Sequence, residues 1–200
     1  MTTSRGKSRT INPWCATSSR RPVSRWTTTD LRTSRLALHP PDETEIRRVL
    51  ANAPEPTDHW SEGFPSDGDV HALASLLERT LRYGDQRPFG VYLISRLVDG
   101  VVIGGIGFHS APDDGRVEIG FGIAPEARGH GFASEAATAL VGLAGELGVR
   151  VVFAVTTPEN AASRKTLLNA GFCQVRVDLV ECVFEVQMNE SEARDELDAQ

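Results

Sequence analysis

The stretch from residue 117 to residue 155 constrains the fold most, because a strand, a turn, a long helix and a second strand follow one another there. Residues 117–123 are predicted to form the first strand. The helical spacing of apolar residues predicts an amphipathic helix over about residues 127–147, ended by Gly148. The wholly apolar run 149–155 predicts a central strand that is buried on both faces. Such a unit is typical of an α/β fold.

Weaker patterns on both sides extend this unit. Asp99 and Gly100 are typical of a hairpin turn between two strands, because both residues tolerate a positive φ. The resulting element order is β-α-α-β-β-β-α-β-α-β-β in a mixed sheet. The further predicted elements are a strand at residues 35–38, a helix capped by Asp42, a loop over 52–69, a helix from Val70, strands at 89–98 and 101–109, a helix over about 160–170, and strands at 172–179 and 182–188.

Charge is divided unevenly along the chain. Residues 1–30 carry a net charge of +5, and residues 31–200 carry −11, within a total of −6. We therefore expect a flexible basic tail over 1–30, one folded domain over 31–188 and an acidic tail over 189–200. An acidic body disfavours nucleic-acid binding and suits a cationic substrate, although plain solubility explains the same charge.

Several classes of protein are excluded by what the sequence lacks. No run of about 18 apolar residues is present, so we expect neither a membrane span nor a membrane partner. No apolar segment follows the N-terminal basic residues, which predicts a cytoplasmic protein without a secretory signal. Cys15, Cys173 and Cys182 fit neither a disulfide framework nor a zinc site. We therefore expect reduced thiols and no bound metal.

Residues 128–133, Arg-Gly-His-Gly-Phe-Ala, carry the most informative motif. Two glycines within three positions allow a tight turn and a close approach to a ligand. The free N–H groups of the following helix then form an anion site that suits a pyrophosphate. The motif is not a Walker A loop, because no Gly-Lys-Ser/Thr follows, and its glycine spacing differs from that of a dinucleotide fingerprint. Taken alone, it fits a mere tight connection as well.

The context of this motif resembles the GNAT N-acetyltransferases. Arg128, Gly131 and Ala133, between a strand and an amphipathic helix, match the acetyl-CoA loop of that family. Residues 158–163, with Gly171-Phe172 after them, resemble its asparagine-bearing loop and the helix that follows. The resemblance covers about residues 31–188, with three motifs in the right order and spacing.

Two further stretches refine the resemblance. Residues 118–125 resemble the fourth strand of the family. Residues 31–36 resemble the opening of the subgroup that includes the acetyltransferases of N-terminal alanine or serine in ribosomal proteins, together with many small-molecule acetyltransferases. The implied fold is an α/β GNAT fold with a mixed, mostly antiparallel central sheet flanked by helices.

The resemblance implies an enzyme that transfers the acetyl group of acetyl-CoA directly to a primary amine. The acceptor is then a small basic amine or a protein N-terminus. Many family members carry a tyrosine as general acid seven positions after the asparagine, but this chain has Leu167 there. A non-catalytic acyl-CoA sensor of the same fold, and an interaction protein with a basic tail, therefore stay open as alternatives. A homodimer through sheet edges is compatible with the fold.

The resemblance also implies which residues bind acetyl-CoA. The fourth and fifth strands of the family splay apart, and the pantetheine arm pairs with backbone groups of the fourth strand. A backbone N–H there is expected to hold the developing oxyanion. Asn160 is expected to contact the pantetheine or the reacting carbonyl, which is compatible with capping a helix. The implied cofactor-binding residues are Phe121, Gly122, Ile123, Arg128, Gly129, His130, Gly131, Phe132, Ala133 and Asn160.

Two residues are candidates for proton transfer. Glu118 occupies the place where some members carry a glutamate base, and by strand alternation it shares a face with Gly120 and Gly122. A solvent-facing or ion-paired glutamate is the alternative. Ser163 matches a serine that is proposed, in relatives of the ribosomal-protein subgroup, to protonate the leaving thiolate. A water molecule is its rival.

Three other groups of residues are candidates for contacts at the site. We expect His130 to contact phosphate rather than to act in catalysis. Arg164 and Lys165 are candidates for the 3′-phosphate of CoA, with solvent exposure as the alternative. The loop before the second helix is expected to border the acceptor site and to suit a cationic amine, through Trp60, Phe64 and Asp67.

Overall fold

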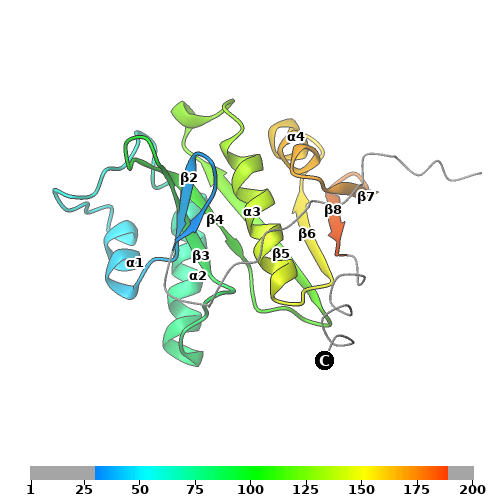
Figure 1. The fold of residues 1–200 in the computed structure, drawn as a ribbon, viewed down its shortest axis with the longest axis horizontal. Helices are drawn as coiled ribbons and strands as arrows, with labels where there is room; N and C mark the ends of the chain where they lie inside the picture. The colour runs from blue at the N-terminus through cyan, green and yellow to red at the C-terminus, as the bar shows by residue number, and fades with distance from the viewer. Residues whose placement is uncertain (1–29, 189–200) are drawn as a thin grey trace, which may run out of the picture.

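The structure is a computed structural model and describes residues 30–188. Apart from Asp30, the expected tails over 1–30 and 189–200 lie outside these residues. Eight strands form one sheet in the order β1-β2-β3-β4-β5-β6-β8-β7 (Figure 1). The elements are β1 (Leu31–Arg32), β2 (Leu36–His39), α1 (Glu43–Leu50), α2 (Asp67–Tyr83), β3 (Val91–Arg96), β4 (Val102–Phe108), β5 (Arg116–Ile123), α3 (Phe132–Glu146), β6 (Val151–Thr156), α4 (Ala161–Asn169), β7 (Cys173–Val177) and β8 (Cys182–Gln187).

The pairing of the strands confirms the predicted fold class. Every neighbouring pair in the sheet is antiparallel except β5 and β6, which are parallel. The sheet is therefore mixed and mostly antiparallel, and helices flank it. One strand was not predicted: β1 has only two residues, which is too short to show an alternating pattern.

Local capping explains where α2 begins. Ser66 and Asp69 form a capping box, in which each side chain accepts a hydrogen bond from the backbone of the other. Helix α2 therefore starts at Asp67, inside the stretch 52–69 that was predicted to be loop. Asp42 and Glu45 form the same arrangement at α1, where the predicted cap is confirmed.

The start of α3 differs from the prediction for a related reason. The predicted helix began near residue 127, but Pro125–Ala127 forms one turn of 3₁₀ helix and α3 begins at Phe132. Gly129 and Gly131 lie between them with φ values of 81° and 78°. Such left-handed residues interrupt an α-helix and shape a loop instead.

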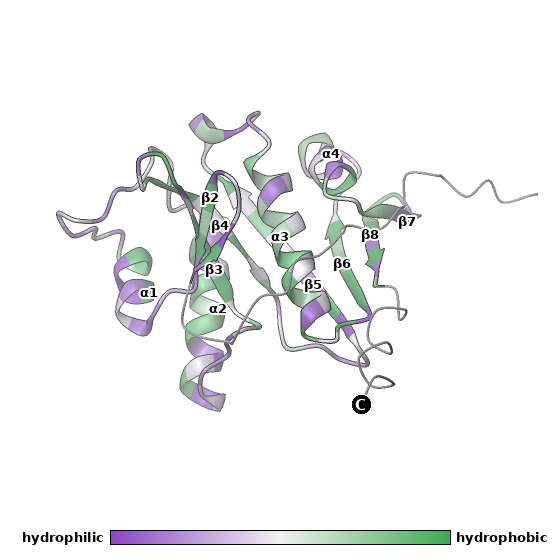
Figure 2. Cartoon of the chain, viewed as in Figure 1, coloured by the Kyte–Doolittle hydropathy of each residue, from purple (hydrophilic) through white to green (hydrophobic). Residues whose placement is uncertain are grey.

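The helices cover both faces of the sheet (Figure 1). Alternating residues of β3 show this: Val91 and Leu93 pack into a small core with α1 and α2, whereas Tyr92 and Ile94 pack into the main core with α3. Figure 2 shows hydrophobic strands between helices whose outer parts are more hydrophilic. Burial of these two apolar layers supplies most of the driving force for folding.

Strand β6 was predicted to be buried on both faces, and this prediction is wrong. Val152 and Ala154 are buried against the side of α3 and α4, but Val155 is 39% exposed. The strand lies inside the sheet, yet it is not buried on both faces, because these helices cover only one of them. Cys182 is a free, buried thiol. Cys173 is disulfide-bonded, so the expectation of reduced thiols is wrong for that residue.

The sheet opens between its two parallel strands. Strand β5 pairs with β6 only from Arg116 to Glu118, although β5 continues to Ile123. The two strands therefore separate beyond Glu118, as the resemblance implied. Among residues 30–188, no helix is long and apolar enough to cross a membrane. In the same part of the chain, no three or more potential metal ligands gather in one place.

Candidate active site

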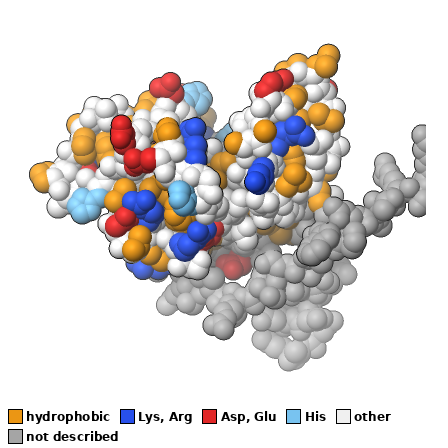
Figure 3. Space-filling view, turned by 90° about the horizontal axis from the view of Figure 1, so that it is seen from above, with side chains coloured by type: hydrophobic (Ala, Val, Ile, Leu, Met, Phe, Trp, Pro, Cys, Tyr) orange, Lys and Arg blue, Asp and Glu red, His pale blue; other side chains and the backbone are white. Residues whose placement is uncertain are grey.

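Two cavities meet where β5 leaves β6. The α2 cavity, of about 420 Å³, lies between α2 and the strands β4 and β5. The α3–α4 cavity, of about 540 Å³, lies between the end of β5, the loop before α3, and the helices α3 and α4. Phe121 and Gly122 line both cavities. Seen from above, the described surface is deeply hollowed between two parts of the molecule (Figure 3).

The α3–α4 cavity gathers most of the residues expected to bind acetyl-CoA. Of the ten expected residues, all but His130 line it, and so does Ser163. Lys165 lines the cavity as well, whereas Arg164 does not, because its Nη1 donates a hydrogen bond to the carbonyl of Pro158 at 3.1 Å. Two motifs about 30 residues apart in the sequence thus form opposite walls of one cavity.

The wall beside α3 has the features of an anion site. The N-cap of α3 is Gly131, which offers no side chain to accept from the N–H groups of the first turn. These N–H groups carry a partial positive charge and lie at the cavity. Arg128 donates from Nε to the carbonyl of Ile123 at 2.9 Å and so ties the loop to the end of β5. The arrangement suits a phosphate group bound by backbone donors.

Arg35, on the turn before β2, supports this loop from outside the cavity. Its Nη1 donates to the carbonyl of His130 at 3.0 Å, and its guanidinium lies 4.8 Å from the ring centre of Phe132. Glu135 on α3 holds Arg35 through Oε2 at 2.6 Å. Burial opposes the charge of Glu135, but hydrogen bonds from Thr33, Arg35 and Ser34 lower its pKa below the ordinary value.

We expect Arg35→Ala to weaken acetyl-CoA binding, because the loop from Arg128 to Phe132 loses its support. The dissociation constant should rise by about 5- to 10-fold, which corresponds to about 1 kcal/mol. A thermal-shift titration with acetyl-CoA measures the change. Arg32→Ala is the matched control, since Arg32 is exposed on the same hairpin and lines neither cavity. Equal affinity in both variants contradicts the supporting role.

The wall beside α4 presents Asn160 and Ser163. Oδ1 of Asn160 accepts from the backbone N–H of Ser163 at 3.0 Å, so this asparagine caps the helix. The Ser163 hydroxyl has no hydrogen-bond partner within residues 30–188. Leu167, at the place of the family's tyrosine, is 1% exposed and packs into the main core.

Neither tyrosine of the sequence can replace the missing one. Tyr92 is buried, and its hydroxyl donates to the carbonyl of Pro88 at 2.7 Å. Burial raises the pKa of Tyr92 to about 12. Tyr83 is 68% exposed at the end of α2. Since neither ring lines a cavity, a tyrosine is not available as general acid.

The α2 cavity has a floor without side chains. On β4 and β5, Gly105 pairs with Gly122 and Gly107 pairs with Gly120. Over this floor, Asp69 of α2 is buried, with 7% exposure. Its Oδ2 accepts from Ser66, whereas Oδ1 has no hydrogen-bond partner among the described residues. This Oδ1 lies 2.9 Å from the position of a Cβ added at Gly105, so it stands directly above the floor.

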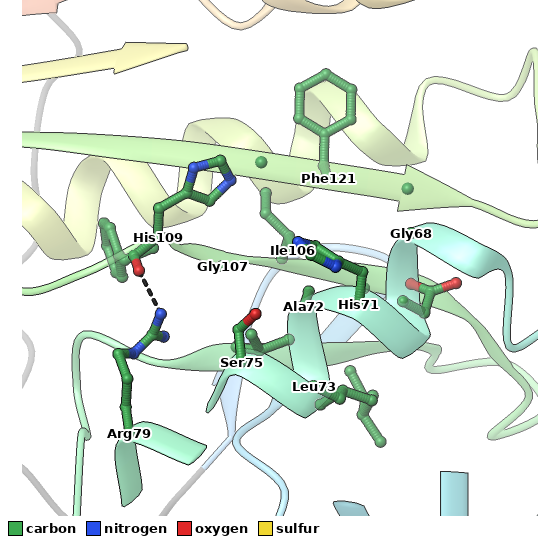
Figure 4. Close-up of a pocket in the computed structure, with 17 residues that line it drawn as sticks. Gly68, His71, Ala72, Leu73, Ser75, Arg79, Ile106, Gly107, His109 and Phe121 are labelled. Atoms are coloured by element: carbon green, nitrogen blue, oxygen red, sulfur yellow. Dashed lines mark hydrogen bonds between the residues drawn. The ribbon is translucent and has the colours of Figure 1, made fainter. Parts of the chain in front are cut away.

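Arg79 and His109 lie at the end of the α2 cavity away from Gly68 (Figure 4). Arg79 donates from Nη1 to the carbonyl of His109 at 2.5 Å, and its Nε is buried without a partner among the described residues. His71 of α2 and His109 at the end of β4 also line the cavity. Glu118 lines neither cavity: its Oε1 lies 3.4 Å from Nδ1 of His109.

Sequence reasoning missed the side chains of the α2 cavity. The expected loop residues do not reach it: Trp60 and Phe64 pack into the small core under α1 and α2, and Asp67 is exposed. Two signals were present. The Ser66-x-x-Asp69 spacing indicates a capping box. Pairing the predicted strands 101–109 and 117–123 as a hairpin places His109 beside Glu118.

Comparison with known proteins identifies a family that shares this fold. A family model described as an acetyltransferase (GNAT) domain matches residues 35–173. The uncharacterized N-acetyltransferase YoaA of Bacillus subtilis (strain 168) is 42% identical over 73 residues, which are 36% of this chain and 41% of that protein. The chain thus spans less than half of that relative.

Solved structures share the fold. An acetyltransferase from Agrobacterium tumefaciens str. C58 has a TM-score of 0.58 and 24% identity, covering 84% of this chain and 100% of that one. The ribosomal-protein-S5-alanine acetyltransferase from Vibrio fischeri has a TM-score of 0.56 and 14% identity, covering 81% and 98%. Because the family model also matches more than half of the sequence, the chain belongs to the GNAT acetyltransferase family.

Proposed function

We propose that this protein is an N-acetyltransferase that transfers the acetyl group of acetyl-CoA directly to a primary amine. One observation carries the proposal: the two cavities lie on different sides of β5 and share Phe121 and Gly122. A thioester entering from one side and an amine entering from the other meet at these residues. Holding two reactants in this way supplies a large part of an enzyme's rate enhancement.

The α3–α4 cavity is the proposed acetyl-CoA site. Backbone donors at the start of α3 support binding of the pyrophosphate. On the edge of β5 that faces the gap beyond Glu118, Phe121 is the proposed partner of the pantetheine amides, because the carbonyl oxygen of Gly122 lies against Gly104 of β4. The carbonyl of Ile123 already accepts from Arg128, so we assign only its N–H to the ligand. Lys165 is the better candidate for the 3′-phosphate than Arg164, because only Lys165 lines the cavity.

The chemistry needs a stabilised oxyanion and two proton transfers. A backbone N–H in the segment Phe121 to Ile123 is the proposed oxyanion donor. Ser163 is the proposed acid for the leaving thiolate, since its hydroxyl is unengaged and lines the α3–α4 cavity. Water is its rival. We retain Glu118 as part of the machinery that takes the proton from the amine.

The α2 cavity is the proposed acceptor site. The buried Asp69 carboxylate, with one oxygen above the glycine floor, supports a cationic amine as acceptor. The volume of about 420 Å³ fits a small basic molecule or the first residue of a protein N-terminus. Both kinds of acceptor are compatible with the family.

We expect Asp69→Asn to raise KM for the amine by about 10-fold with little change in KM for acetyl-CoA. The amide keeps an oxygen for the capping box but loses the charge that attracts the ammonium. Steady-state kinetics with both substrates separate the two constants. Asp67→Asn removes an exposed carboxylate two residues away and serves as the control. Equal KM values in both variants contradict the proposed acceptor site.

Release of free CoA thiol from acetyl-CoA tests the function. The full chain is assayed against polyamines, aminoglycosides, and peptides that begin with alanine or serine. Transfer to one class establishes the enzyme and selects the acceptor. A thermal-shift titration with acetyl-CoA accompanies every assay, because a ligand that binds only the native state raises its stability.

Two negative outcomes have different meanings. Stabilisation by acetyl-CoA without transfer to any amine supports the alternative of a non-catalytic acyl-CoA sensor, for which the buried Leu167 is the structural argument. Absence of stabilisation contradicts the assignment of the α3–α4 cavity to the cofactor and leaves an interaction protein.

A further inference from the structure

His109 and Glu118 form a cross-strand pair that the sequence motifs did not reveal. His109 follows the last residue of β4, and its backbone N–H donates to the carbonyl of Glu118 on β5 at 3.0 Å. The neighbouring register pair, Phe108 with Ile119, fixes the alignment of the two strands. Both side chains therefore stand on the same face of the sheet, where Oε1 of Glu118 lies 3.4 Å from Nδ1 of His109.

Only the imidazole of this pair reaches the α2 cavity. His109 lines the cavity and Glu118 does not. A Cβ added at Gly120 would lie 2.6 Å from Nε2 of His109, so the ring occupies the space that the glycine leaves free. Figure 4 shows the ring turned from the end of β4 toward β5. Glu118 therefore contacts the far nitrogen of the ring, and Nε2 faces the floor of the cavity.

We propose that His109 accepts the proton of the acceptor amine through Nε2, and that Glu118 positions the ring from Nδ1. This rests on the proposed acetyl transfer. A carboxylate next to Nδ1 favours the tautomer with the proton on Nδ1, which leaves the lone pair of Nε2 free to act as a base. Contacts of this kind are often long in a free enzyme and shorten when the substrate binds. The geometry thus makes Glu118 a positioning residue rather than the base itself.

The proposed step balances in protons and bonds. Nε2 of His109, directly or through one water, takes one proton from the ammonium. The free amine nitrogen attacks the thioester carbonyl, and a C–N bond forms while the C–S bond breaks. The second proton of the attacking nitrogen ends on the departing thiolate, relayed by Ser163 or water. The products are the acetamide, CoA thiol and one proton, which the 57% exposed side chain of His109 returns to solvent.

The other charged groups around the α2 cavity are placed differently. Arg79 contacts the backbone carbonyl of His109 and so holds the end of β4. Asp69 stands over Gly105, toward the other end of the floor. His71 also lines the cavity, but it is exposed and no carboxylate contacts it among the described residues. His109 is therefore the imidazole in this cavity whose orientation a second side chain controls.

The first test needs no acceptor. Nitrogen-15 NMR of the neutral histidines reports which ring nitrogen carries the proton, and His109→Gln assigns the signal. In the wild-type protein we expect His109 to carry its proton on Nδ1. In Glu118→Ala, the population of His109 with its proton on Nε2 should rise. Glu118→Gln should keep much of the Nδ1-protonated form, because the amide oxygen can still accept a hydrogen bond from Nδ1. A wild-type His109 with its proton on Nε2 overturns the proposal, whatever the enzyme acetylates.

The second test measures kcat with the amine that the thiol-release panel selects. His109→Ala should lower kcat by about 100-fold, and added imidazole should restore a substantial part of it. Glu118→Gln should lower kcat by less than about 10-fold. Added to His109→Ala, it should lower kcat little further. His59→Gln is the matched control, since His59 is exposed and lines neither cavity. It removes an imidazole outside the site.

Gly120→Ala tests the geometry without altering either side chain of the pair. The added methyl displaces the end of a flexible ring rather than backbone, so stability should change little. We expect kcat to fall by about 10-fold, because Nε2 moves away from the floor. If Glu118→Gln is instead the most damaged variant while His109→Ala keeps wild-type kcat, Glu118 is the base and the proposal is wrong. A wild-type protein inactive on every amine refutes the proposed function, and the NMR result still decides the pair.

Discussion

Gly122→Ala is expected to lower kcat/KM of acetyl transfer by about 100-fold while acetyl-CoA still binds. Gly122 lies where the two cavities meet, and a Cβ there points toward Asp69 and Ser66, on the acceptor side. A methyl group at that point displaces the amine from the thioester carbonyl. A displacement of about 1 Å is enough for a loss of this size.

The fold should tolerate this substitution. The nearest atoms to the added Cβ are Oδ1 of Asp69 at 3.7 Å and Oγ of Ser66 at 3.9 Å, which are ordinary contacts. Gly142→Ala is the matched control, because it adds the same methyl to the middle of α3, where no atom lies within 4 Å. That variant should keep full activity and gain a little stability, since alanine favours a helix.

Kinetics and thermal shift together decide the outcome for Gly122. Loss of kcat/KM with an unchanged acetyl-CoA shift places the junction of the cavities at the reacting atoms. Wild-type kcat/KM in Gly122→Ala contradicts this placement. Loss of the acetyl-CoA shift instead means that the methyl disturbs the cofactor side, and that the division between the two cavities is wrong.

The second large effect is on stability. Gly104→Ala is expected to lower the free energy of unfolding by about 3 kcal/mol or more. Gly104 has a φ of 154°, and an added Cβ would lie 2.1 Å from the carbonyl oxygen of Gly122 on the neighbouring strand. That oxygen belongs to the backbone, so the clash is relieved only by moving β4 away from β5.

Gly100→Ala separates the clash from backbone strain. Gly100 also has a positive φ, of 70°, but no atom lies within 4 Å of an added Cβ. The free energy of unfolding of Gly100→Ala should therefore fall by only about 1 kcal/mol, the usual cost of a left-handed residue with a side chain. Urea unfolding of the two variants at one temperature measures the difference. Equal losses contradict the close approach of β4 and β5 at this point.

The elements of the fold followed from local patterns. The helix cap at Asp42, the turn at Asp99-Gly100 and the apolar spacing of α3 each act over a few residues. The predicted starts of two helices were wrong, because other local interactions set where these helices begin. Ser66 and Asp69 start α2 early, and the left-handed glycines at 129 and 131 delay α3. The two-residue strand β1 is held by its partner and has no pattern of its own.

The candidate site also has a part that follows from local sequence and a part that depends on tertiary packing. Each motif of the proposed acetyl-CoA site is contiguous in the sequence, because a loop and the helix after it build an anion site from neighbouring backbone N–H groups. The α2 cavity, the proposed acceptor site, is built from α2, β4 and β5, and it brings Asp69 within reach of Gly105 and His109 within reach of Glu118. The hairpin of β4 and β5 brings His109 beside Glu118, but no local spacing encodes the contact of Asp69 with the position of Gly105.

The sequence by itself determined the family, through the resemblance of its motifs, and the mixed sheet, through periodicity, caps and turns. Only the tertiary structure decided that Glu118 stands behind His109, that Asp69 rather than Asp67 faces the cavity, and that Trp60 and Phe64 belong to the core. Strand register and the packing of α2 across the sheet set these positions, and both arise from contacts between residues far apart in the chain.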